Sequence, residues 1–341
     1  MEIETEQVLS AGPRPLEGEV VIACLNGMTE DRVRSLIGPE TPAARISVAT
    51  VERDASPADV DAILRRADLV IAGGGHRIRL DRRALGLMER CHLIQQPSVG
   101  FDQIDHRAAA ALGIPVANCA GYNRDSVADW VILGILNVIR YAAQGDRMIR
   151  AGGWGAAATG RELGAMTVGI VGLGNVGGAV ATRLRAFGSP ILYHDIAPRS
   201  LPGARPVSLP ELLRSSDIVT VHVPLDRETT GLIGPQEFAT MREGTVFVNA
   251  SRGPVVDEAA LIENLQNGHL RAAALDVFEY EPLPAESPLR ELDNVFLTSH
   301  IGGNTEECRA RALEFVGTNL RRVIAGLEPF NVVNGVGYRR P

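Results

Sequence analysis

TVGIVGLGNVGGAVATRLRAFGSPILYHD, which spans residues 167–195, decides the fold of this chain. Its apolar run at 168–171 predicts a buried strand, and the helical spacing of the apolar residues after it predicts a helix. Between them lie Gly172, Gly174 and Gly177 in the pattern G-x-G-x-x-G. The first glycine allows a tight turn, the second lets backbone approach a pyrophosphate, and the third lets the helix pack on the strand. Strand, glycine turn and helix in this order therefore predict a dinucleotide site.

The strand after this helix bears on which nicotinamide dinucleotide is bound. It is predicted at 191–194 and ends on Asp195, near the spacing at which an acidic residue bonds the adenosine ribose. A carboxylate there repels the additional phosphate of NADP, so Asp195 favours NAD. Arg199 lies four residues further on and would instead favour NADP.

The composition narrows the classes of function. A chain of 341 residues is long enough for two domains, and its net charge of -7 predicts no basic surface for nucleic acid or anionic lipid. The four cysteines are scattered without a C-x-x-C pair, which argues against a disulfide framework and against a zinc site. Neither a signal-peptide core nor a stretch long enough to span a bilayer is found. We therefore expect a cytoplasmic protein with no metal and no nucleic-acid or membrane partner.

Strands and helices alternate along the chain, which predicts an α/β fold with parallel sheets covered by helices. After a loose tail at 1–18, strands are expected at 19–25, 44–51, 69–72, 92–96 and 114–118. From the glycine motif on, six strands are expected for a doubly wound sheet, at 168–171, 191–194, 218–223, 246–249, 272–276 and 295–298. A long amphipathic helix at about 305–325 is expected to return the chain to the first domain.

The most apolar predicted helix is SVADWVILGILNVIR, residues 126–140, with Asp125 or Ser126 as its cap. It is too short to cross a membrane, so we expect it between domains or in a subunit contact. The glycine-rich stretch at 151–164 has no regular pattern and is expected to be a loop anchored by Trp154.

The ends of four predicted strands carry groups suited to chemistry. In an open parallel sheet, ligands bind outside the carboxyl ends of the strands. The groups found there are Val223-Pro224, the stretch NASRG at 249–253, Asp276, and the stretch SHIGG at 299–303. Asp276 could accept a hydrogen bond from the nicotinamide carboxamide, and a residue that only caps the strand end would look the same.

Arg252 is the candidate for binding a carboxylate. Its neighbours Ser251 and Gly253 permit close approach, and a planar guanidinium can hold a carboxylate through two hydrogen bonds. We therefore expect Arg252 to orient an α-keto acid. The alternative is an arginine in a surface turn, because arginine is usually exposed.

His300 is the candidate acid/base. Hydride transfer to a ketone leaves an alkoxide that needs a proton, and histidine titrates near working pH. His194 and His222, at strand ends in the cofactor half, are its nearest rivals. A carboxylate bonded to His300 would favour the charged imidazole and fix its tautomer. Glu279 and Glu281, in FEYEPLP, both fit that role on local sequence.

The motifs GLGNVG with YHD, NASRGPVVDEAAL, AALDVFEYEPLP and TSHIGGNT resemble, in this order, the D-isomer-specific 2-hydroxyacid dehydrogenases. The likeness covers about residues 90–310. It implies hydride transfer between NAD and a small 2-hydroxy acid or 2-oxo acid. The catalytic arginine, glutamate and histidine of the family fall on Arg252, Glu281 and His300, so the resemblance selects Glu281 over Glu279.

The resemblance also implies which residues bind the ligands. SVGFDQID, residues 98–105, resembles the substrate loop of the family, in which N–H groups around Val99 and Gly100 hold the substrate together with Arg252 and His300. The residues expected at the cofactor are Gly172, Gly174, Asn175, Val176, Gly177, Asp195, Val223, Pro224, Ala250, Ser251, Arg252, Asp276, His300 and Gly303.

Two Rossmann-like or flavodoxin-like domains, each with a doubly wound parallel sheet and with the active site in the cleft between them, are implied as well. The substrate-binding domain would comprise 1–119 with 304–341, and the NAD-binding domain 120–303. Members of the family usually form homodimers through the cofactor domain, with the 126–140 helix in the contact. Two alternatives stay open, namely a formate- or phosphite-type dehydrogenase and a corepressor-like protein that senses NAD(H).

Overall fold

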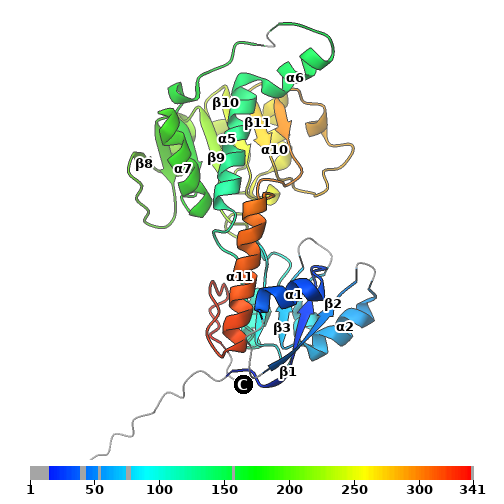
Figure 1. Cartoon of the computed structure of the whole chain (residues 1–341). Helices are drawn as coiled ribbons and strands as arrows, with labels where there is room; N and C mark the ends of the chain where they lie inside the picture. The colour runs from blue at the N-terminus through cyan, green and yellow to red at the C-terminus, as the bar shows by residue number, and fades with distance from the viewer. Residues whose placement is uncertain (1–14, 39–43, 53–54, 74–77, 156–157, 339–341) are drawn as a thin grey trace, which may run out of the picture. The chain divides into compact units, whose positions relative to one another are not determined.

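The computed structural model describes residues 15–38, 44–52, 55–73, 78–155 and 158–338. Most of the predicted tail at 1–18 therefore lies outside the described residues. The chain divides into two compact units (Figure 1). The first unit comprises Met1–Tyr122 with Arg309–Pro341, and the second unit comprises Asn123–Cys308.

The first unit contains a five-stranded parallel sheet in the order β2-β1-β3-β4-β5 (Figure 1). This is the flavodoxin-like order of a doubly wound sheet. The strands are β1 (Gly18–Cys24), β2 (Ala44–Thr50), β3 (Leu69–Ile71), β4 (Leu93–Gln95) and β5 (Val116–Ala117). The helices are α1 (Glu30–Ile37), α2 (Pro57–Arg66), α3 (Arg82–Leu85), α4 (His106–Ala111) and most of α11 (Glu306–Ile324). As predicted, the last helix returns the chain to this unit, where Val316 and Leu320 are buried in the core.

The second unit contains a seven-stranded parallel sheet in the order β12-β11-β10-β9-β6-β7-β8. Its strands are β6 (Val168–Val171), β7 (Ile191–His194), β8 (Ala204–Pro206), β9 (Ile218–Val221), β10 (Thr245–Asn249), β11 (Leu270–Leu275) and β12 (Val295–Leu297). Its helices are α5 (Arg124–Arg140), α6 (Ala142–Arg150), α7 (Asn175–Phe187), α8 (Leu209–Ser215), α9 (Pro235–Thr240) and α10 (Glu258–Gln266), with short 3₁₀ turns η1 (Leu163–Ala165), η2 (Gly253–Val255) and η3 (Pro288–Arg290). The predicted α/β class with two doubly wound parallel sheets is confirmed.

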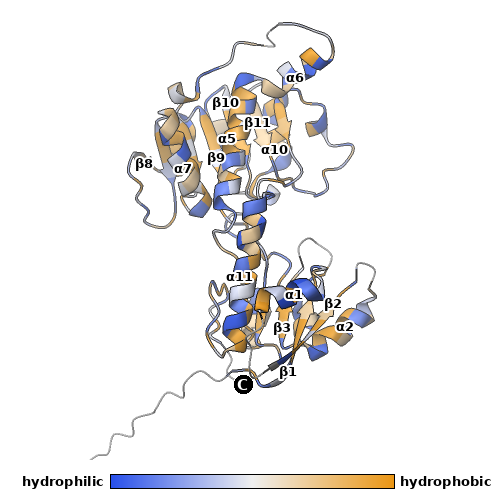
Figure 2. Ribbon diagram, in the orientation of Figure 1, coloured by the Kyte–Doolittle hydropathy of each residue, from blue (hydrophilic) through white to orange (hydrophobic). Residues whose placement is uncertain are grey.

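Both faces of the second sheet are buried, as a parallel sheet requires. Successive strand residues point to opposite faces, so Val246 and Val248 of β10 pack in one apolar cluster with α5 and α7. Phe247 lies in the other cluster, with α8, α9 and α10. Figure 2 shows the apolar residues concentrated on the strands of each unit. Six of the seven strands of this sheet were predicted. The one that was not is β8, because its exposed Arg205 and Pro206 give no apolar alternation.

The segment that contains α5 and the residues after it differs in several details from the prediction. The helix begins at Arg124, and its N-cap is Asn123 with no side-chain hydrogen bond, so neither Asp125 nor Ser126 caps it. Most of its apolar side chains lie in the core of the second unit. The next helix, α6, was not predicted because it is largely polar, and none of its residues is buried. Trp154 is 93% exposed, so its predicted role as a loop anchor is wrong.

No single described helix is long and apolar enough to cross a membrane. Taken together, α5 and α6 reach that length and composition, but the chain bends by 64° between them.

Candidate functional site

The glycine turn occupies the switch point of the second sheet. β6 pairs with β7 on one side and with β9 on the other, and open α/β sheets bind ligands where the strand order reverses. Gly172 has φ +92°, which a glycine adopts without strain. A Cβ on Gly177 would lie 2.1 Å from the carbonyl oxygen of Gly172, so only glycine lets α7 start this close to the strand.

The residues of this turn fit a dinucleotide pyrophosphate. A Cβ on Gly174 would meet nothing within 4 Å, so the backbone there is open to a ligand. No described side chain caps α7, which leaves the N–H groups of its first turn, at Asn175 and Val176, available to phosphate oxygens. The turn also lies close to the segment that follows β9, because a Cβ on Gly172 would lie 3.0 Å from the side chain of Val223. Pro224 is the next residue of that segment. The structure thus brings these predicted cofactor residues together.

Asp195 is tied to the same turn. Its carboxylate accepts hydrogen bonds from the backbone N–H of Leu173, at 2.7 Å, and of Ala197, at 2.8 Å. Each carboxylate oxygen can accept a second bond, so acceptor capacity remains for ribose hydroxyls. The Arg199 side chain is exposed.

The loop after β10 holds Arg252 through a buried asparagine. Asn249 accepts hydrogen bonds from the N–H of Ser251 at 3.0 Å and from its hydroxyl at 2.9 Å, and donates to the carbonyl of Arg252 at 3.0 Å. The half-buried guanidinium of Arg252 donates from Nη1 to the carbonyl of Ser251 at 2.7 Å. Half-buried Ala250 packs beside the core of the unit. Sequence reasoning named Asn249 only as part of the motif and missed its positioning role.

Gly253 allows two loops of the site to pack closely. A Cβ there would lie 1.9 Å from the backbone carbonyl of Phe278. The glycine therefore lets the loop after β10 press against the loop after β11, which carries Glu281.

Glu281 and His300 form a direct hydrogen bond. Nδ1 of His300 lies 2.8 Å from Oε2 of Glu281, and Oε1 accepts from the N–H of Phe278 at 3.2 Å. Burial raises the pKa of Glu281, but the bond from His300 and the positive charges of His300 and Arg252 outweigh burial and hold that pKa below its ordinary value. Glu279 is exposed and bonds Glu258 through its backbone N–H. With Nδ1 bonded to a carboxylate, Nε2 is the ring atom left to exchange a proton.

His300 has a backbone conformation that the sequence did not reveal. Its φ is +56°, in the left-handed region, which costs a residue other than glycine about 1–2 kcal/mol. Buried Asp276 holds the turn, since its carbonyl accepts from the N–H of His300 at 2.8 Å and its carboxylate accepts from the N–H groups of Ile301 and Gly302 at 2.8 and 2.7 Å. Such strain is concentrated at functional sites. Asp276 thus shapes the histidine loop, which includes the half-buried predicted cofactor residue Gly303.

The two rival histidines are placed for structural roles. Nε2 of His222 lies 2.9 Å from the hydroxyl of Thr220, and burial lowers the pKa of His222 to about 3, so its ring is neutral at neutral pH. Nδ1 of His194 lies 3.2 Å from the carbonyl of Val207. Among the described residues, no group of three or more His, Cys, Asp or Glu side chains could hold a metal ion.

The predicted substrate loop follows β4 in the first unit. The backbone N–H groups of Val99 and Gly100 make no hydrogen bond to any described residue. Unpaired N–H groups in a turn can bind an anion. Phe101 at the end of this run packs edge-on against His106, with ring centroids 5.2 Å apart.

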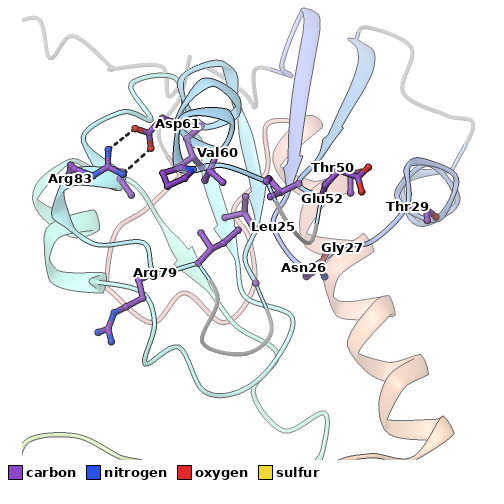
Figure 3. A pocket seen from close by; sticks show the side chains of 17 residues that line it. Leu25, Asn26, Gly27, Thr29, Thr50, Glu52, Val60, Asp61, Arg79 and Arg83 are labelled. Atoms are coloured by element: carbon purple, nitrogen blue, oxygen red, sulfur yellow. Dashed lines mark hydrogen bonds and ion pairs between the residues drawn. The ribbon is translucent and has the colours of Figure 1, made fainter. Parts of the chain in front are cut away.

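A cavity of about 1060 Å³ lies at the carboxyl ends of β1, β2 and β3 (Figure 3). Arg83 and Asp61 line it and form a two-bond ion pair of 2.7 and 3.0 Å. Val99 and Gly100 do not line this cavity. Arg79 lines it as well.

The role of Glu281 has a testable consequence for pH dependence. Glu281→Gln keeps the size of the side chain but removes the charge that favours a protonated imidazole. We expect kcat for reduction to fall by about tenfold or more, and the falling limb of the pH–rate profile to move to lower pH. Glu279→Gln is the matched control and should leave the profile unchanged. An unmoved limb in Glu281→Gln would contradict this role.

The lowered pKa of Glu281 also predicts how stability depends on pH. Because the folded-state pKa lies below the ordinary value of 4.5, the charged carboxylate stabilises the fold above that pH. This stabilisation is lost as the pH falls through the folded-state pKa. The difference in free energy of unfolding between wild type and Glu281→Gln should therefore shrink as the pH falls below 4.5. A difference that grows on acidification would show the opposite shift.

A glycine turn at the switch point of a doubly wound sheet, with an arginine and a carboxylate–histidine pair at strand ends of the same unit, defines a nicotinamide-dependent dehydrogenase. The family model described as D-isomer specific 2-hydroxyacid dehydrogenase, NAD binding domain, matches residues 132–302. The chain belongs to the D-isomer specific 2-hydroxyacid dehydrogenase family. It is an NAD-dependent enzyme, and the predicted resemblance and cofactor are confirmed.

Individual relatives agree with this assignment. A glyoxylate reductase of Thermofilum pendens is 40% identical over 266 residues, which cover 75% of this chain and 78% of that protein. A D-3-phosphoglycerate dehydrogenase of Archaeoglobus fulgidus is 38% identical over 261 residues, which cover 75% of this chain and 50% of that protein. The crystal structure of a glyoxylate reductase from Paecilomyes thermophila matches 90% of this chain and 95% of its own, with 28% identity and a TM-score of 0.81.

Proposed function

We propose that this enzyme reduces small 2-oxo acids to D-2-hydroxy acids, with glyoxylate among its substrates. The hydrogen bond of 2.8 Å between His300 and Glu281, with Arg252 close enough to influence that carboxylate, supports the proposal most directly. Several similar proteins are glyoxylate reductases, which supports the choice of substrate.

Each residue has a defined part in this proposal. The guanidinium of Arg252 binds the substrate carboxylate, and the N–H groups of Val99 and Gly100 bind it as well. Bound NADH supplies the hydride to the carbonyl carbon. Nε2–H of protonated His300 gives its proton to the carbonyl oxygen as that oxygen becomes a hydroxyl. Glu281 orients the ring and stabilises its charged form.

A substrate panel tests this function. NADH consumption is followed by absorbance with glyoxylate, hydroxypyruvate and pyruvate, and NAD reduction is followed with formate and phosphite. We expect turnover of at least one 2-oxo acid and none of formate or phosphite. Turnover of formate or phosphite alone would favour that type of dehydrogenase, and NADH binding without any turnover would favour a corepressor-like sensor.

The carboxylate of Asp195 predicts a preference for NADH over NADPH. Asp195→Ala removes the charge that repels the additional phosphate, so the ratio of kcat/KM for NADH to that for NADPH should fall by about tenfold or more. Arg199→Ala is the control and should leave kcat/KM for NADH unchanged. An unaltered ratio in Asp195→Ala would show that Asp195 does not select the cofactor.

We further propose a homodimer. Exposed apolar side chains follow one another along α5, α6 and the next segment, namely Leu133 at 53%, Ile149 at 51% and Trp154 at 93% exposure. Burying these side chains against a second copy would be favourable. Sedimentation velocity should give the mass of two chains, and a monomer would contradict this. We also propose a cytoplasmic location. The four cysteines are buried and form no disulfide among the described residues, which supports it, and cell fractionation tests it.

A further inference from the structure

The first three carbonyl groups of the substrate loop accept hydrogen bonds from the protein. The carbonyl of Ser98 accepts from the N–H of Cys119 at 3.1 Å. The carbonyl of Val99 accepts from Nδ2 of Asn118 at 2.8 Å, and the carbonyl of Gly100 accepts from the hydroxyl of Ser98 at 3.0 Å. The orientations of three successive peptide groups are therefore fixed by hydrogen bonds that their carbonyl oxygens accept.

Fixing the carbonyls also fixes the N–H groups. In a planar trans peptide, the N–H of a residue points opposite to the carbonyl of the residue before it. The carbonyls of Ser98, Val99 and Gly100 thus direct the N–H groups of Val99, Gly100 and Phe101 away from the bonded groups. None of these three N–H groups has a hydrogen-bond partner among the described residues. Those of Val99 and Gly100 are the donors proposed above for the substrate carboxylate, and the N–H of Phe101 is a third donor beside them.

The side-chain amide of Gln96 holds the loop in this conformation. Its side chain is 1% exposed, and both ends of its amide are used. Nε2 donates to the hydroxyl of Ser98 at 2.6 Å, and that hydroxyl donates on to Gly100. Oε1 accepts at 2.9 Å from Gln103, which also donates at 2.9 Å to the carbonyl of Gly73 after β3. One buried amide therefore connects the start of the loop, its far end and the loop after β3.

We propose that Gln96 is a positioning residue that sets the affinity of this enzyme for its 2-oxo acid. It contacts no substrate itself but orients the hydroxyl of Ser98, which fixes the carbonyl of Gly100 and so the direction of the next N–H. This inference rests on the proposed function of the loop at 98–105. Loss of Gln96 weakens substrate binding equally in the ground state and the transition state, so it raises KM and leaves kcat unchanged.

The neighbouring residue provides a matched control. Gln95 is also a buried glutamine, at 0% exposure, and successive strand residues face opposite sides of a sheet. Its Oε1 accepts from Nδ2 of Asn319 in α11 at 2.7 Å, and its Nε2 donates to the carbonyl of Gln96. Its side chain makes no hydrogen bond with the described residues of the loop and instead ties the sheet to α11. Gln95→Met and Gln96→Met thus remove similar buried amides from neighbouring positions, one at the end of β4 and one just after it, whose side chains bond different parts of the fold.

The test is steady-state kinetics with glyoxylate and NADH, together with thermal unfolding. In Gln96→Met we expect KM for glyoxylate to rise by about tenfold, as for the loss of one hydrogen bond, with kcat and KM for NADH nearly unchanged. In Gln95→Met we expect a lower unfolding temperature but an unchanged KM for glyoxylate. An equal rise of KM in both variants, or a fall of kcat alone in Gln96→Met, would overturn the proposal.

A second pair of variants tests the same chain of bonds without disturbing the strand. Ser98→Ala removes the hydroxyl between Gln96 and Gly100, so it should raise KM for glyoxylate, whereas Ser98→Thr keeps the hydroxyl and should stay near the wild-type value. The double variant Gln96→Met/Ser98→Ala should resemble Gln96→Met, because both changes break one chain. Additive effects would overturn the proposal. Absence of 2-oxo acid turnover by the wild type would overturn the proposed function and this inference together, whereas failure of the variants alone would overturn only this inference.

Discussion

Replacing His300 by asparagine is expected to lower kcat for 2-oxo acid reduction by about 10²–10⁴-fold, the usual contribution of a positioned general acid. The dissociation constant for NADH should stay unchanged, because the proton donor acts on the chemical step. Asparagine is the informative choice, since it tolerates the φ of +56° at this position better than alanine does. Stopped-flow kinetics and NADH fluorescence titration measure the two quantities.

A control and a contrast make the His300 result specific. Nε2 of His269 lies 3.0 Å from the carbonyl oxygen of Phe238. His269 directly precedes β11, so it lies at the amino end of that strand, whereas His300 follows the carboxyl end of β12. His269→Asn should therefore retain turnover. His300→Ala should lose about 1 kcal/mol more stability than His300→Asn, because alanine does not favour the left-handed region. If His300→Asn kept turnover within tenfold of the wild type, His300 would not be the proton donor.

Arg252→Met is expected to lower kcat/KM for the 2-oxo acid by about 10²–10⁴-fold. Two charge-assisted hydrogen bonds to the substrate carboxylate are lost, each contributing about 1.5–3 kcal/mol. Arg252→Lys keeps the charge but not the planar fork, so it should recover only part of the loss. Steady-state kinetics over a range of glyoxylate concentrations provides the measurement.

Arg271 is the matched control for Arg252. It lies at the amino end of β11, where its Nη2 donates to the hydroxyl of Tyr141 at 2.7 Å. Arg271→Met should leave kcat/KM near the wild-type value. Equal losses in the two methionine variants would mean that Arg252 acts on the fold and does not bind the substrate.

Much of the fold follows from local sequence. The run at 168–195 predicted β6, α7 and β7, because apolar periodicity and the glycine spacing agree there. Elements without an apolar pattern were missed. β8 is a short edge strand with Pro206, and α6 is a polar helix whose residues are all outside the core. Such elements depend on what surrounds them and leave little local trace.

The site was predicted less completely than the fold. Strand ends located Arg252 and His300, but the choice of Glu281 over Glu279 needed the family resemblance, since contact between distant loops is not written in local sequence. The left-handed backbone of His300 depends on Asp276, which lies on another strand. Gln96 was missed, although two glutamines inside a buried strand are unusual and could have marked it.

We propose that this enzyme moves a hydride from NADH to a 2-oxo acid whose oxygen receives the proton of His300. The most direct test uses NADH deuterated at the transferred position and a prochiral 2-oxo acid such as hydroxypyruvate, with the product analysed by mass and configuration. We predict a D-2-hydroxy acid with one deuterium on its hydroxyl-bearing carbon, formed by the wild type and far more slowly by His300→Asn. A product without that deuterium, or of the L configuration, would contradict the account.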